Sequence, residues 1–163
     1  MGARENVEVM LEILRRIERR DPRRPDVERA RALFQPDVEF HWPPSLPYGG
    51  TTRGLKAEGR TWAQTWDPLQ PTDAERRLDP RVVAASDDEV VVLWKQRGLS
   101  PAGDRLEGEV LGLYKIREGK LARAQMFYFD TAAVMNFLEK ETGSSIRTGG
   151  VSSSPERGPR GGT

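Results

Sequence analysis

The sequence contains no cysteine and a single histidine, and these two scarcities exclude several kinds of site at once. Without cysteine there is no disulfide, no thiolate nucleophile and no thiolate metal ligand. With His41 as the one imidazole, a zinc or iron site is not expected, because such sites draw on several His or Cys ligands. No glycine-rich loop joins a strand to a helix as phosphate sites require. We therefore expect neither a metal ion nor a cofactor.

Long apolar runs and an excess of one charge are also missing. No apolar segment approaches the roughly 20 residues that a membrane-spanning helix needs, and no segment has the basic start and apolar core of a signal peptide. Lys and Arg number 26 and Asp and Glu 25, a formal net charge of +1. This balance gives no case for binding nucleic acid or an anionic membrane. We expect a cytoplasmic protein with a different kind of ligand.

The 163 residues are enough for one domain with a single core. After Lys140 the composition changes to Gly, Ser, Pro, Thr and Arg with hardly an apolar residue. Such a segment buries too little surface to offset the entropy cost of ordering it. We predict one domain over residues 1–142 and a flexible tail over residues 143–163.

Helical patterns come first in the chain and alternating patterns later, which is the order of an α+β domain. Apolar spacing and proline positions predict early helices over 6–20, 25–34 and 54–69. Alternation predicts strands over 38–42, 81–85, 89–97, 106–116 and 121–130, with a helix over 131–140. The polar Arg-Glu-Gly-Lys of 117–120 should close an antiparallel hairpin, and 47–51 and 70–80 should be loops.

Alternation along these strands also predicts which side chains share one face of the sheet. That face carries Trp42; Val92, Trp94 and Gln96; Val110, Gly112 and Tyr114; and Met126, Tyr128 and Asp130. Trp62 and Trp66, one helical turn apart, would close the space from the helix side, near Tyr48 on its loop. The result would be a wide aromatic cavity for a large, flat or polyunsaturated hydrophobic ligand, with Gly112 leaving room. The competing interpretation is that these aromatic residues simply fill a core.

The few polar candidates each have a structural alternative. Asp130 could act as an acid or base at the rim of the cavity, or it could cap the helix that follows it. Tyr114, Tyr128 and Gln96 could hydrogen-bond a substrate carbonyl. His41 is a possible acid–base group, but alternation sets it on the opposite face of its strand, which favours a role at the surface or in a dimer interface.

Four segments together resemble the nuclear transport factor 2-like superfamily, and within it the SnoaL-like group of polyketide cyclases and ketosteroid isomerase relatives. They are DVEFHW at 37–42, LPYGGTTRG at 46–54, REGK at 117–120 and YFDTAA at 128–133. The resemblance implies a cone-shaped α+β barrel in which three N-terminal helices pack on a strongly bent antiparallel sheet and enclose one pocket. It also implies a homodimer formed through the outer sheet face.

The chain departs from the ketosteroid isomerase pattern at the residues that carry that chemistry. Such an enzyme needs a carboxylate base and an oxyanion hole built from a tyrosine and a protonated acid. The corresponding positions here hold Trp42, an aliphatic residue near Leu14, and Gly112, none of which can carry a proton. Ketosteroid isomerisation is therefore not expected.

We predict a cofactor-independent cyclase or isomerase for a hydrophobic polyketide-type intermediate in antibiotic biosynthesis. It would act mainly by confining a flexible chain in a reactive conformation, a mechanism that extends to pericyclic ring closure. Two alternatives stay open. One is a non-catalytic small-molecule-binding or assembly module. The other is an epoxide-hydrolase-like enzyme, which would require a register that turns Arg97, Glu107 and Glu109 inward.

Overall fold

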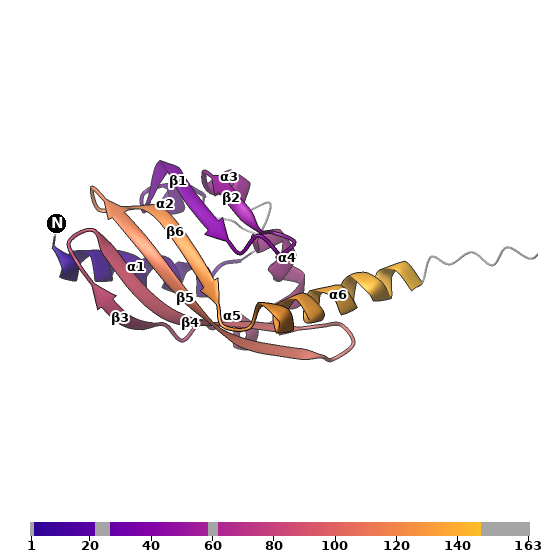
Figure 1. Cartoon of the computed structure of the whole chain (residues 1–163). Coiled ribbons are helices and arrows are strands. Elements are labelled where there is room, and N and C mark those ends of the chain that lie inside the picture. The colour runs from indigo at the N-terminus through magenta and orange to yellow at the C-terminus, as the bar shows by residue number, and fades with distance from the viewer. Residues whose placement is uncertain (1, 22–26, 59–61, 148–163) are drawn as a thin grey trace, which may run out of the picture.

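In the computed structural model, six strands form one curled sheet with helix α1 lying across its inner face (Figure 1). The structure describes residues 2–21, 27–58 and 62–147. The helices are α1 (Ala3–Glu18), α2 (Val27–Arg31), α3 (Leu55–Glu58), α4 (Gln64–Trp66), the 3-10 turn η2 (Asp67–Leu69), α5 (Asp73–Arg76) and α6 (Thr131–Arg147). The strands are β1 (Phe34–Trp42), β2 (Gly50–Arg53), β3 (Arg81–Ala85), β4 (Glu89–Leu99), β5 (Arg105–Arg117) and β6 (Lys120–Tyr128).

The strand order is β2-β1-β6-β5-β4-β3, and the two edge strands do not pair with each other. Neighbouring strands are antiparallel except β1 and β6, which run parallel. The predicted α+β fold with a bent sheet and helices on its inner side is confirmed. The sheet is mixed, however, and not antiparallel throughout as predicted, because the chain returns after β5 to place β6 beside β1 in the same direction. It is also unclosed, since its edge strands β2 and β3 do not pair.

The long hairpin predicted at the centre of the sheet is confirmed. β5 and β6 pair from Val110↔Tyr128 to Arg117↔Lys120. Their connection is a two-residue turn in which Glu118 and Gly119 both have positive φ, 52° and 73°. This is the backbone that a tight hairpin with right-handed strand twist requires.

Several predicted element boundaries were wrong. β1 begins at Phe34 and passes through Pro36, where the register with β6 shifts; such an irregularity is where a strand accepts a proline. Strand β2 begins within the loop predicted over 47–51 and extends beyond it to Arg53. Helix α5, which Thr72 caps, lies within the loop predicted over 70–80. The helix predicted over 54–69 is broken into α3, α4 and η2, and residues 59–61 lie outside the described residues.

The C-terminal part also differs from the prediction. β6 ends at Tyr128, two residues early, and α6 continues to Arg147. The flexible tail predicted over 143–163 lies outside the described residues from residue 148 on. In the described part of the chain, no helix has both the length and the apolar character needed to cross a membrane.

Alternating burial along β4 shows how the sheet separates its two faces. Val90, Val92, Trp94 and Gln96 are at most 4% exposed, whereas the residues between them are half-buried on the outer face. Buried side chains from α1, the sheet and α6 join in one hydrophobic core. The single core expected for a chain of this length is therefore observed.

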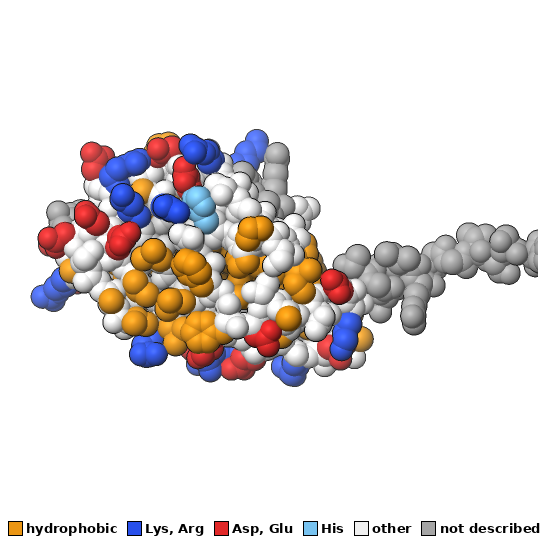
Figure 2. All heavy atoms as spheres, in the orientation of Figure 1, with side chains coloured by type: hydrophobic (Ala, Val, Ile, Leu, Met, Phe, Trp, Pro, Cys, Tyr) orange, Lys and Arg blue, Asp and Glu red, His pale blue; other side chains and the backbone are white. Residues whose placement is uncertain are grey.

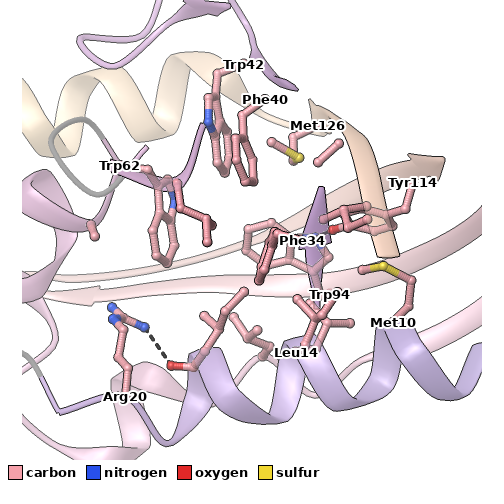
Figure 3. A pocket seen from close by; sticks show the side chains of 17 residues that line it. Met10, Leu14, Arg20, Phe34, Phe40, Trp42, Trp62, Trp94, Tyr114 and Met126 are labelled. Atoms are coloured by element: carbon pink, nitrogen blue, oxygen red, sulfur yellow. Dashed lines mark hydrogen bonds between the residues drawn. The ribbon is translucent and has the colours of Figure 1, made fainter. Parts of the chain in front are cut away.

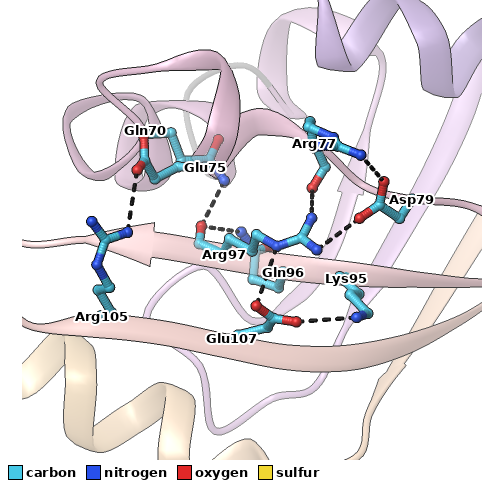
Figure 4. A network of polar contacts seen from close by, with 9 residues as sticks. All are labelled: Gln70, Glu75, Arg77, Asp79, Lys95, Gln96, Arg97, Arg105 and Glu107. Carbon is cyan, nitrogen blue, oxygen red and sulfur yellow. Dashed lines mark hydrogen bonds and ion pairs between the residues drawn. The ribbon is translucent and has the colours of Figure 1, made fainter.

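Charged side chains of the central strands point outward, in a network drawn in Figure 4. Arg97 donates to Asp79 Oδ2 at 2.7 Å and to Glu107 Oε2 at 3.4 Å, while Lys95 donates to Glu107 Oε1 at 3.1 Å. Hydrogen bonding from Arg97 lowers the pKa of the Asp79 carboxyl. Glu109 is exposed on the same face. The register that would turn Arg97, Glu107 and Glu109 inward is thus wrong, and the epoxide-hydrolase-like alternative loses its charged cluster.

Candidate functional site

A cavity of about 220 Å³ lies between α1 and the inner face of the sheet (Figure 3). Helix α1 supplies one wall through Met10, Ile13, Leu14 and Ile17, whose i, i+3, i+4, i+7 spacing forms one apolar stripe. The sheet supplies Phe34, Phe40, Trp42, Trp94, Tyr114, Leu121, Ala124 and Met126. Leu55, Trp62, Ala63, Leu78 and Arg20 complete the lining. Arg20 is charged, and the other described lining residues are apolar or aromatic.

Two tryptophans form the aromatic end of this cavity. The rings of Trp42 and Trp62 stack with centroids 6.0 Å apart and planes 9° from parallel. The Trp62 Nε1–H donates to Gln96 Oε1 at 3.2 Å. The guanidinium carbon of Arg20 lies 5.0 Å from the Trp62 ring centroid, a cation–π contact. Trp62 is thus held by a partner on each side, and its nitrogen is already satisfied.

Tyr114 brings a hydroxyl group to the cavity wall. Its oxygen accepts a hydrogen bond of 2.9 Å from Trp94 Nε1, and the residue is 5% exposed. Burial raises the pKa of Tyr114 far above its ordinary value. The hydroxyl therefore stays protonated near neutral pH, and its oxygen already has a donor. No acceptor for the hydroxyl's own proton is found among the described residues.

The position of the Tyr114 ring depends on Gly112. A Cβ built on Gly112 would lie 2.2 Å from the Tyr114 hydroxyl oxygen and 2.3 Å from Cζ. The ring thus lies back along β5 over the glycine, in space that any larger residue would occupy. Gly112 was predicted to leave room for a ligand, but the room is filled by Tyr114.

Arg20 is the one charged residue among the described residues that line the cavity. Its guanidinium donates to Asp67 Oδ1 at 2.8 Å, to the Ile17 carbonyl at 3.0 Å and to Gln70 Oε1 at 2.5 Å. The side chain is 18% exposed. Sequence analysis did not single out Arg20, which lies just past the end of α1 at Glu18.

A second polar cluster lies outside the lining, behind Trp42 and Trp62. The hydroxyls of Tyr48 and Tyr128 are 2.7 Å apart, and the Tyr128 hydroxyl lies 3.5 Å from Gln96 Oε1. Burial raises the pKa of Tyr128 well above its ordinary value. Tyr128 and Gln96 were predicted to contact a substrate carbonyl, and Tyr48 to bind substrate. The structure instead places all three against the back of the tryptophan wall.

The prediction that these side chains share the cavity is correct for only part of the set. Trp42, Trp62, Trp94 and Met126 line it together with Tyr114. Val92, Val110 and Trp66 are fully buried elsewhere in the core. Trp66 stacks on Phe137 of α6, 6.1 Å between centroids and 6° between planes. Alternation predicts that a side chain lies on the inner face of the sheet. It does not predict that the side chain reaches the cavity, and Val92 and Val110 are fully buried without lining it.

Two predicted catalytic residues lie outside the cavity. Asp130 is exposed, and its Oδ1 accepts the backbone N–H of Ala133 at 2.9 Å, which caps α6. The alternation that placed Asp130 at the cavity rim does not reach it, because β6 ends at Tyr128. His41 lies on the outer face between Glu39 Oε2, at 2.9 Å, and Thr51 Oγ1, at 3.1 Å.

Sequence analysis missed the helix wall because alternation was applied to the strands alone. The signal was available, since Met10, Ile13 and Leu14 belong to the apolar stripe already recognised over residues 6–20. Across the part of the chain that the structure describes, no group of three or more His, Asp or Glu side chains is placed to hold a metal ion.

A family model of the SnoaL-like domain matches residues 15–124. No curated protein sequence matches the chain. Among solved structures, TerC, co-crystallised with polyporic acid, has a TM-score of 0.67 and 25% identity over 83% of this chain and 98% of TerC.

Two further solved structures share the fold at lower identity. A SnoaL-like polyketide cyclase, so assigned, from Jannaschia sp. CCS1 has a TM-score of 0.61 and 19% identity over 82% of this chain and 91% of its own. IdmH from Streptomyces antibioticus, assigned as a polyketide cyclase, has a TM-score of 0.61 and 17% identity over 81% and 97%.

Proposed function

The chain belongs to the SnoaL-like domain family, and from this premise we propose that it is a cofactor-independent cyclase or isomerase acting on a hydrophobic polyketide-type intermediate in antibiotic biosynthesis. The observation that carries the proposal is the phenol of Tyr114 in the wall of a cavity whose other described lining residues, Arg20 apart, are apolar or aromatic. TerC with polyporic acid and the polyketide cyclases among the similar structures support the same class of ligand.

Confinement supplies the first part of the mechanism. The aromatic and aliphatic lining would limit a flexible substrate to few conformers, so the entropy of bringing two ends of a chain together would be lost on binding. Well-oriented intramolecular reactions gain up to about 7–11 kcal/mol from this effect. Stacking on Trp42 and Trp62 would favour flat, conjugated conformers.

Tyr114 supplies the second part. The Tyr114 hydroxyl would donate a hydrogen bond to a substrate carbonyl oxygen on which negative charge develops. Trp94 Nε1 donates to the same phenol oxygen, which makes the Tyr114 hydroxyl a stronger donor. Removing one such donor from a water-poor site costs about 10²–10³ in rate in well-studied enzymes.

No carboxylate or imidazole lines the cavity among the described residues, so we assign no general base to the protein. The chemistry that fits is a ring closure or isomerisation in which a carbonyl is polarised and protons move within the substrate. Electrocyclic and related pericyclic closures also fit, because they form the new bond by rearranging electrons within the substrate and need no proton transfer to or from the protein.

The test compares three proteins on linear polyketide intermediates, with products identified by mass spectrometry. Cyclisation conserves mass or loses water, whereas epoxide hydrolysis adds water. Tyr114→Phe should lower kcat about 10²-fold, a larger effect than the up to about tenfold rise in KM. Asp130→Asn, which keeps the helix cap, should match the natural chain. Ligand-induced thermal stabilisation without any product would instead identify a non-catalytic binding module.

We also propose that the outer sheet face pairs with a second copy of the chain. Figure 2 shows hydrophobic side chains gathered on the face turned to the viewer. On the outer face of the sheet, Phe127 is 45% exposed and pairs with half-buried Leu111, next to half-buried Leu113, and Phe129, just past the end of β6, is 62% exposed. A patch of this kind on a folded domain usually marks an interface. Sedimentation should show a dimer that Phe127→Glu dissociates and Val83→Glu, on edge strand β3, does not. A monomeric natural chain would contradict the pairing.

A further inference from the structure

The cavity offers two polar groups at opposite ends of an apolar space. In Figure 3, Tyr114 lies beside Met10 at one end and Arg20 lies beyond Leu14 at the other. The seven-residue step along α1 from Met10 to Ile17 corresponds to roughly 10 Å at about 1.5 Å per residue. A ligand that uses both ends must therefore be elongated.

The two ends differ in charge and in exposure. Tyr114 is 5% exposed and protonated, so its end suits a neutral acceptor such as a ketone oxygen. A carboxylate there would lose its hydration without a countercharge, which is costly. Arg20 has an 18% exposed side chain, so an anion there keeps some water while pairing with a cation.

The Arg20 guanidinium still has hydrogens to offer. Three of its five N–H groups donate to Asp67, Ile17 and Gln70, and each Nη nitrogen uses one of its two hydrogens. These bonds fix the guanidinium over Trp62. Asp67 offsets part of the charge, so the strength of an anion site at Arg20 should depend on Asp67.

We propose that the cavity binds a compact keto acid, with its ketone on Tyr114 and its carboxylate on Arg20. This inference rests on the proposed function and names its substrate class. The volume of about 220 Å³ lies above the ~150 Å³ of an engineered cavity that takes benzene and below the ~300–1,000 Å³ of ordinary drug-sized sites. The apolar body is therefore one or two rings, or an acyclic chain of similar length, and a four-ring skeleton does not fit.

The experiment measures affinity by titration calorimetry for four probes that share an aromatic body. They are 6-acetyl-2-naphthoate, 2-acetylnaphthalene, 2-naphthoate and the four-ring pyrene-1-carboxylate. The natural chain should bind 6-acetyl-2-naphthoate most tightly and pyrene-1-carboxylate at least tenfold more weakly than 2-naphthoate.

Variants then test each end separately. Tyr114→Phe should weaken only the two ketones, about two- to tenfold, and Arg20→Met should weaken only the carboxylates, about ten- to hundredfold. Because Arg20→Met also strips Asp67 of its partner and can harm folding, Asp67→Asn gives a second readout. This substitution keeps the shape of the side chain at position 67 and removes the negative charge that competes for Arg20. The affinity for the carboxylate probes should therefore rise, and the affinity for 2-acetylnaphthalene should stay unchanged.

The results distinguish failure of the keto-acid proposal from failure of the proposed cyclase or isomerase function. Naphthalene probes that bind with equal affinity, with or without a carboxylate, would overturn the Arg20 anchor. Tighter binding of pyrene-1-carboxylate than of 2-naphthoate would overturn the size limit. Either result leaves the proposed cyclase or isomerase standing. If none of the four probes binds, the cavity is not a ligand site, and both proposals fall.

Discussion

Replacing Gly112 by alanine should destabilise the fold by displacing one buried ring. A Cβ at this position would overlap the Tyr114 hydroxyl oxygen at 2.2 Å and its Cε2 at 2.4 Å, distances that no packed structure tolerates. The backbone of a paired central strand cannot move far, so the ring must swing away. Its hydrogen bond with Trp94 Nε1 is then lost.

The cost has two parts. A buried indole N–H left without an acceptor costs about 1–3 kcal/mol. Forcing a ring out of a packed core costs about 1–3 kcal/mol more. Together they lower the free energy of unfolding by about 2–6 kcal/mol, which corresponds to roughly 4–24 °C in Tm for a domain of this size.

The chain supplies a matched control on the same face of the same strand. A Cβ at Gly108 would meet nothing within 4 Å, so Gly108→Ala should be neutral or slightly stabilising. Urea unfolding followed by tryptophan fluorescence measures both. In a Tyr114→Ala background, Gly112→Ala should cost almost nothing, because the clash has gone. Equal stability of Gly112→Ala and Gly108→Ala would refute the reasoning.

Three further predictions follow from other contacts. Asp130→Ala removes the cap on Ala133 and should lower the free energy of unfolding by about 0.5–2 kcal/mol, with ligand affinity unchanged in calorimetry. Burial raises the pKa of Tyr114 and Tyr128, so only the unfolded chain loses these protons near pH 10; stability should fall as pH rises above about 10, and phenolate absorbance should appear only with unfolding. Ala124→Leu fills the cavity and should raise the free energy of unfolding by about 0.5–2 kcal/mol while abolishing probe binding, both checked on one preparation.

The fold was predictable where local patterns are strong. Short stretches of sequence predict the alternation in β4 and β5 and the turn at Glu118 and Gly119. The β5–β6 hairpin follows from these local patterns. Strand β2 was missed because it is only four residues long, begins with a glycine, lies between two more glycines, and pairs only with β1. The parallel β1–β6 pair joins segments some eighty residues apart, and no local pattern encodes such a contact.

For the candidate site, the sequence predicts which strand side chains point to the inner face of the sheet. It does not predict which of them border the cavity. Inward placement of Trp94, Tyr114 and Met126 follows from the pleat of a strand. Which of these lines an empty space depends on side-chain rotamers, as the folding of Tyr114 over Gly112 shows. Asp130 was misplaced because a strand was assumed to continue two residues past its end.

A cavity of 220 Å³ lowers the stability of a folded domain. At ~24 cal/mol per Å³ it would cost about 5 kcal/mol, as much as the whole net stability of a marginal domain. The walls stay apart because Gln96 holds Trp62 and Tyr114 holds Trp94, each through an indole N–H. The same two bonds consume the polar atoms of both tryptophans, so the cavity presents carbon faces with one phenol proton and Arg20. The bonds that keep the space open thus also determine what the space can recognise.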